Sequence, residues 1–238
     1  MALLNDHRQH DDEPAGIPDV AASGAERVVF FSDAVVAIAI TLLALALPVP
    51  AGTDGWTDGH MLHALGHHWP DYLAFFISFY VIGNHWAAHR RVFRYVNRLN
   101  HRVGTLNMLW LLTMILTPFA ARLLASNGGF GVRFTIYALL QVVASASLLL
   151  ISREITARDL VRADTPDSAR HHDDSATLGM IVAFLVSIPV AFATEWAFAV
   201  WAGSSVIAAL LRRQRAARAP SAPAAPSADP SGPGGQPA

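Results

Sequence analysis

The sequence predicts an all-α integral membrane protein with six transmembrane helices in each subunit. Of the 238 residues, 53% are hydrophobic and only 15% are charged, whereas a soluble domain carries about 25% charged residues. Apolar runs long enough to cross a bilayer recur along the chain, and polar, arginine-rich segments separate them. The chain has no cysteine, which excludes disulfides and thiolate metal sites. A net charge of −1 gives no indication that the protein binds nucleic acid.

The first span follows an acidic N-terminal segment. Residues 1–22 are polar, which predicts a disordered cytosolic arm. Ser23 and Glu26 then stand three residues apart, as in a capping box, so we expect the first helix to begin there. Residues 28–49 form an apolar run, and its length of about 33 Å as a helix suffices for a hydrocarbon core of about 30 Å.

Five further spans are expected. A loop containing His60, His63, His67 and His68 precedes the second apolar run, and we expect that loop to be solvated. The last apolar block is too long for one crossing, and Pro189 with the Ala193-Thr194-Glu195 step is expected to split it into two spans. Residues 23–211 thus form a transmembrane domain. The three middle runs cover residues 72–89, 105–125 and 132–152, and the last block covers residues 176–211. Residues 212–238 are rich in alanine and proline, which predicts a disordered cytosolic tail.

The arginines predict the orientation. With both termini in the cytosol, 15 of the 17 arginines fall in cytosolic segments, and only Arg122 and Arg133 fall outside. This asymmetry satisfies the positive-inside rule. We therefore expect a multi-pass protein of the plasma membrane. The use of arginine without any lysine, together with abundant alanine, indicates a GC-rich, bacterial source.

One carboxylate lies inside the first span. An aspartate at the centre of a membrane helix costs roughly 2.5–3.5 kcal/mol, so Asp33 should face protein and have a partner. The candidate partners lie at the same depth on the second and third spans: His85, Trp86, His89, Asn107 and Trp110. Two interpretations stay open, namely a structural polar cluster that locks three helices together and a proton-sensitive switch.

The opposite side of the first span is nearly apolar. Its residues follow spacings of four and three and form one stripe: Ala34, Ile38, Thr41, Leu45 and Pro48. An ordinary helix–helix interface explains such a stripe, with Thr41 bonding back to the carbonyl of Ala37. A stripe that lines a pore is the alternative.

The first span also resembles a known family. Arg27-Val28-Val29-Phe30-Phe31-Ser32-Asp33 is similar to the R-x-x-x-F-S-D signature of the endolysosomal potassium channel family and its prokaryotic homologues. A second similar block contains Trp86, His89, Phe93, Asn107 and Pro118. The resemblance implies a homotetramer in which the first helix of each subunit lines a central pore. It also implies a structural network behind that helix, made of Arg27, Phe31, Ser32, Asp33, Trp86, His89 and Asn107.

Carried over by position, the resemblance assigns roles to three residues of the stripe. Ile38 matches the hydrophobic constriction, Leu45 the next apolar ring, and Thr41 a hydroxyl layer between them. A ring of isoleucines can close a pore by dewetting. Potassium sheds water more cheaply than sodium, so the resemblance implies passive and modestly selective potassium conduction. It implies no enzyme activity, cofactor or metal, and the partners are further copies, membrane lipids and the permeant K⁺.

Two other functions remain open on sequence grounds. A proton-coupled secondary transporter would use Asp33 and His89 as a relay, but such folds contain paired broken helices, and only Pro189 breaks a span here. A membrane scaffold without transport is the second. The spacing of His85 and His89 suits one face of a metal site, yet no third ligand accompanies them.

Overall fold

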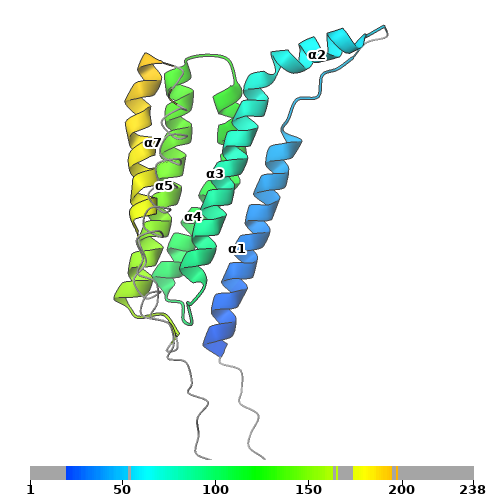
Figure 1. Ribbon diagram of the computed structural model, residues 1–238. Helices are drawn as coiled ribbons and strands as arrows, with labels where there is room; N and C mark the ends of the chain where they lie inside the picture. Colours follow the sequence, from blue (N-terminus) through cyan, green and yellow to red (C-terminus); the bar gives the residue numbers. More distant parts are fainter. Residues whose placement is uncertain (1–19, 53–54, 163–164, 166–173, 195–196, 198–238) are drawn as a thin grey trace, which may run out of the picture.

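The computed structural model describes residues 20–52, 55–162, 165, 174–194 and 197. These residues form a long bundle of helices with one shorter helix turned away from it at one end (Figure 1). The helices are α1 (Val20–Leu45), α2 (Asp58–His67), α3 (Trp69–Phe93), α4 (His101–Ala125), α5 (Phe130–Ala157) and α7 (Ser175–Ala193). The prediction of an all-α chain is confirmed for the described residues.

The predicted bounds of the first helix were wrong at both ends. α1 begins at Val20 rather than at Ser23, because the intervening alanines are strong helix formers and extend the helix past the capping-box pattern. It ends at Leu45, four residues before the predicted end. Pro48 explains the early end, since a proline disfavours helical geometry in the residue before it.

The segment between the first two spans contains a helix where a solvated loop was predicted. α2 begins after Thr57, whose backbone N–H donates to Nδ1 of His60 at 3.3 Å. Glycines and histidines hid the helical spacing of Met61, Leu62 and Leu65. α3 then starts two residues after α2 ends, with a proline in its first turn.

Four of the described helices are long and apolar enough to cross a membrane: α1 from Gly24, α4, α5 and α7. α3 has 25 residues, like α4, and packs against α1, α4 and α5. Its last turns carry histidines and arginines, which lower its mean hydropathy. Pro189 lies inside α7. Apart from Ala197, the predicted sixth span lies outside the described residues, as does Glu195. Both predicted terminal segments also lie outside them, except for residues 20–22 at the start of α1.

The helices pack in an order that leaves α1 at one edge. α4 contacts α1, α3 and α5, whereas α7 packs mainly against α5 at the opposite edge (Figure 1). The core between them contains the largest fully buried side chains, among them Trp110, Tyr137, Phe134, Ile82 and Met114. As a consequence, α1 has only α3 and α4 as its main neighbours within the described chain.

A polar cluster ties the loops at one end of the bundle together. The segment after α3 pairs with the segment after α5, where the N–H of Arg162 donates to the carbonyl of Tyr95 at 2.9 Å. Beside this pair, the nearly buried Glu154 accepts a hydrogen bond from Asn100 at 2.8 Å. Its carboxylate also pairs with Arg102 at 3.3 Å and with Arg158 at 3.5 Å. No pattern in the sequence predicted this cluster.

Candidate functional site on the first helix

α1 has a buried face and an exposed face on opposite sides. The buried residues recur at spacings of three, four and seven and turn toward α3 and α4: Ala25, Ser32, Val36, Ala39 and Leu43. The residues of the predicted stripe from Ala34 to Leu45 all lie on the exposed side. Ile38 is 58% exposed and Leu45 is 81% exposed. Within one subunit, therefore, the stripe contacts no other helix extensively.

Thr41 lies on the exposed face with its hydroxyl bonded locally. Its Oγ1 donates to the carbonyl oxygen of Ile38 at 2.8 Å, so the predicted acceptor, Ala37, was wrong. Threonine in a helix reaches a carbonyl three or four residues back through different χ1 rotamers. The Thr41 oxygen keeps its lone pairs and stays at the surface of the stripe, one turn from Ile38.

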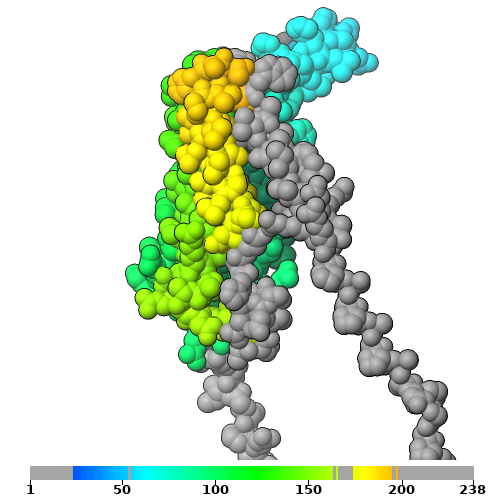
Figure 2. All heavy atoms as spheres, turned by 60° about the vertical axis from the view of Figure 1, so that its left-hand side comes forward, coloured from blue at the N-terminus to red at the C-terminus, as the bar shows by residue number. Residues whose placement is uncertain are grey.

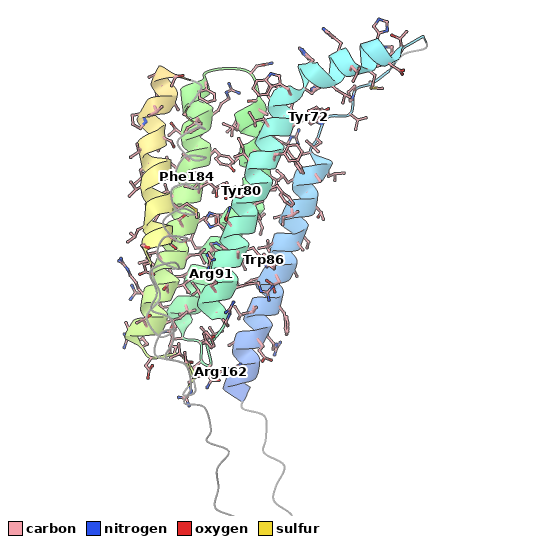
Figure 3. All side chains as sticks on the ribbon, in the orientation of Figure 1. Tyr72, Tyr80, Trp86, Arg91, Arg162 and Phe184 are labelled. Carbon is pink, nitrogen blue, oxygen red and sulfur yellow. The ribbon has the colours of Figure 1, made fainter. Side chains whose placement is uncertain are left out.

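Asp33 is bonded to α3 through an indole. Nε1 of Trp86 donates to Oδ1 of Asp33 at 2.9 Å, and Figure 3 shows Trp86 on the side of α3 that faces α1. The guanidinium carbon of Arg90 lies 4.9 Å above the Trp86 ring, within the range of a cation–π contact. The half-buried carboxylate of Asp33 thus has Trp86 as the hydrogen-bond partner that its depth in the membrane requires. The positive charge of Arg90 lies on the ring of that same tryptophan.

Ser32, the residue before Asp33, is bonded to α4. Nδ2 of Asn107 donates to the Ser32 hydroxyl at 3.0 Å, and that hydroxyl donates to the carbonyl of Val28 at 2.8 Å. Oδ1 of Asn107 accepts from Nε2 of His89 at 2.9 Å. The buried amide of Asn107 therefore connects α1, α3 and α4 at one level of the bundle.

Aromatic rings hold His89 in place. Phe93 and Trp110 stack on it, each with a centroid distance of 4.4 Å and interplanar angles of 25° and 14°. His85 is buried one turn away, but its ring makes no hydrogen bond to the described residues. No group of three or more potential metal ligands occurs in the described part of the chain. The structure thus joins His89 and Trp110 to the cluster and leaves His85 beside it.

Two predicted members of the network lie elsewhere within one subunit. Arg27 is exposed, and Phe31 is 53% exposed. Both follow the helical spacing of the Ile38 stripe and so lie on the face opposite Ser32. Within the single chain Arg27 does not share a face with Asp33, because six residues separate them and turn Arg27 about 240° around the helix. The place of Arg27 and Phe31 in the network stays a prediction. Arg90 contacts the network instead, and its position one turn after Trp86 was the available signal.

The fold and this site define a multi-pass helical membrane protein. Its first long helix is fixed from behind by polar bonds to two neighbours and presents an apolar edge with one hydroxyl on its free side.

Comparison with known proteins supports the resemblance stated from the sequence. Residues 27–118 match the family model described as Endosomal/lysosomal potassium channel TMEM175. This range runs from the first residue of the R-x-x-x-F-S-D signature to Pro118 of α4 and includes every bonded residue of the network. The resemblance stated from the sequence is confirmed: these residues are similar to the TMEM175 family.

Curated relatives match a little over two fifths of the chain. A potassium channel of Streptomyces collinus is 46% identical over 99 residues, which cover 42% of this chain and 47% of that protein. A potassium channel of Chamaesiphon minutus is 41% identical over 108 residues, 45% of this chain and 52% of the relative. The mouse protein named Endosomal/lysosomal proton channel TMEM175 is 39% identical over 105 residues, 42% of this chain and 21% of its own length. The matched part thus spans about half, or less, of these curated relatives, which are named as channels and not as enzymes.

A solved structure extends the likeness to the whole fold. The crystal structure of a lysosomal potassium-selective channel TMEM175 homologue from Chamaesiphon minutus superposes with a TM-score of 0.60 and 28% sequence identity. The superposition covers 81% of this chain and 98% of the other chain. The similarity in fold therefore continues beyond α4, where the family model ends.

Proposed function

We propose that this protein is a potassium channel of modest selectivity that conducts passively through a pore lined by α1. The observation that carries the proposal is the exposure of the Ile38–Thr41–Leu45 edge on the face of α1 opposite its polar anchors. The family model that covers α1 from residue 27 is described as a potassium channel, and two bacterial relatives of the chain are named potassium channels, which supports this interpretation of the exposed edge.

The pore requires several copies, and we propose a homotetramer. Alanines at positions 34, 37 and 44 lie on the exposed side of α1, and small residues let neighbouring helices approach closely. An open groove of about 670 Å³ runs beside this edge, between the end of α1 and α4. Its apolar walls include Leu42, Leu45, Phe119 and Leu123, and they offer a surface on which a neighbouring copy can pack.

Conduction in this arrangement is controlled by dehydration. A ring of Ile38 side chains forms a narrow apolar constriction that excludes water when closed. When it is open, a cation gives up part of its hydration shell there, and the Thr41 hydroxyls one turn away replace part of it. Because K⁺ loses water at a lower free-energy cost than Na⁺, potassium passes more easily. Leu45 forms a second apolar ring.

The direction of the chain in the membrane is part of the proposal. We propose a plasma-membrane protein with its arginine-rich end in the cytosol. That end of the bundle carries the last turn of α3, the first turn of α4 and the last turns of α5, with Arg91, Arg102 and Arg153 among their residues. Arg122 and Arg133 lie at the opposite ends of α4 and α5.

The proton-coupled transporter gains little support from the geometry. Its two proposed relay residues bond to different partners, since Asp33 accepts from Trp86 and His89 bonds to Asn107. A transporter would show saturable uptake coupled to a proton gradient, and a scaffold would show no ion flux.

Flux through purified protein in liposomes tests the channel proposal. We expect potassium efflux that exceeds sodium efflux, and we expect Ile38→Asn to increase both by wetting the constriction. Ile136→Asn on α5 is the matched control, because Ile136 is also exposed and α5 is not among the main neighbours of α1. Equal flux in the two variants, or no flux above empty liposomes, would contradict the proposal.

A further inference from the structure

α2 is amphipathic, and none of its ten residues is buried. Three histidines fall within about 60° of one another around the helix: His60, His63 and His67. The apolar side chains Met61, Leu62 and Leu65 lie on the opposite face. All three are exposed, and Leu62 is 69% exposed. The helix therefore presents an apolar face that no described part of the chain covers.

The position of α2 places this apolar face at the end of the membrane-crossing region. α2 connects the end of α1 to the start of α3 and lies across the direction of the bundle (Figure 1). Figure 2 shows α2 projecting beyond the side of the bundle. A helix that leaves the bundle sideways at the end of a membrane-crossing helix lies along the membrane surface.

The corner between α2 and α3 is held by specific contacts. Nδ1 of His68 lies 3.3 Å from a carboxylate oxygen of Asp71. The hydroxyl of Tyr72 donates to the carbonyl of Pro48 at 3.3 Å, which fixes the start of α3 to the chain just after α1. These contacts stabilise the start of α3, from which α2 projects.

We propose that α2 is an interfacial helix whose Met61, Leu62 and Leu65 face inserts among the lipid acyl chains, with the histidine face turned to water. Its separated polar and apolar faces and low overall hydrophobicity are those of helices that lie in the membrane interface. Trp69 follows at the start of α3 and is 61% exposed, and tryptophan is enriched at the depth of the lipid headgroups. Trp56 precedes α2 at its other end. The proposed occupant of the apolar face is therefore lipid. A second copy of the chain is the alternative occupant, and the experiment below distinguishes the two.

The absence of cysteine from the sequence allows a direct test with single-cysteine variants. Leu65→Cys and His63→Cys are two positions apart and so point about 160° away from each other. Each full-length variant is labelled with an environment-sensitive fluorophore in liposomes of phosphatidylcholine and phosphatidylglycerol. Quenching is measured with nitroxide-labelled lipid and, separately, with iodide on both sides of the membrane.

We expect nitroxide lipid to quench the Leu65→Cys probe several-fold more than the His63→Cys probe, and iodide to show the reverse order. The Met61→Cys and His67→Cys pair provides an independent repetition. Equal lipid quenching of the two faces, or iodide quenching of both, would overturn the proposal. A Leu65→Cys probe shielded from both quenchers, with bismaleimide cross-links between copies, would assign the face to a subunit contact and also overturn it. Potassium flux of the same variants reports separately on the channel, so the two proposals fail independently.

Discussion

The indole Nε1 of Trp86 lies 2.9 Å from Oδ1 of Asp33 and donates its hydrogen to it, across 53 residues of sequence. This bond joins α3 to α1 at the point where α1 carries a carboxylate inside an apolar helix. The adjacent residue, Ser32, is bonded to α4 through Asn107. Two consecutive residues of α1 thus bind it to two different helices.

Removing the indole donor is expected to destabilise the subunit. Trp86→Phe keeps an aromatic ring but leaves Asp33 without its partner, and we expect a loss of about 1–2 kcal/mol for this half-buried group. The thermal midpoint of the purified protein in detergent measures the effect. Trp69→Phe is the control, because Trp69 is largely exposed and no described hydrogen bond involves its indole. Equal midpoints for the two variants would refute a stabilising role for the bond.

Asn107 is expected to be the most sensitive polar position. Asn107→Ala removes the bonds to His89 and Ser32 and leaves both groups buried without that partner, for an expected loss of roughly 2–4 kcal/mol. Ser32→Ala removes one of these bonds and should cost less. A double-mutant cycle between the two positions should give a coupling energy above about 0.5 kcal/mol. Additive effects would show that the bond contributes nothing measurable.

Glu154 and the exposed Glu26 provide a matched pair of charge substitutions. Glu154→Gln retains an acceptor for Asn100 but loses the charge that faces Arg102 and Arg158, so we expect about 1–3 kcal/mol of destabilisation that decreases with added salt. Glu26→Gln removes a carboxylate that is 3.9 Å from Arg162 and well exposed, and should cost little. Denaturation of both variants at low and high salt separates these outcomes; a larger effect at Glu26 would contradict the assignment.

The Thr41 hydroxyl is expected to affect selectivity rather than folding. Thr41→Val keeps the shape of the side chain and removes the oxygen, so the ratio of K⁺ to Na⁺ permeability should fall a few-fold, which corresponds to about 1 kcal/mol. Thr41→Ser keeps the hydroxyl and should preserve most of the ratio. Reversal potentials under bi-ionic conditions measure it. An unchanged ratio in Thr41→Val would remove the hydroxyl layer from the mechanism.

The part of the fold that hydropathy controls was predictable, and the part that depends on distant pairing was not. The apolar runs predicted α1, α3, α4, α5 and α7. The free-energy cost of a carboxylate in a membrane predicted a partner for Asp33 at the depth of Trp86. The pairing of Asn100 with Glu154 joins residues 54 positions apart without any periodic pattern. α2 was missed because its apolar residues alternate with glycine and histidine, which weakens the helical signal.

The position of Arg27 shows a different limit. A family motif groups residues that are near in sequence, but the turn of the helix separates them in space. Arg27 and Phe31 lie on the exposed face, whereas Ser32 turns to the buried face and Asp33 is half-buried at its side. In the proposed tetramer, what contacts the exposed pair depends on the neighbouring copies, and the sequence of one chain does not describe those contacts.

Two bonds, one at the middle of α1 and one just after its end, have a mechanical consequence. Trp86 holds α1 at Asp33, and Tyr72 holds the chain just after it at the Pro48 carbonyl, and both residues belong to α3. The segment between these points, which contains Ile38 and Leu45, cannot slide along α3 without breaking one of them. In the proposed pore, a displacement of Ile38 that keeps both bonds therefore moves α1 and α3 together.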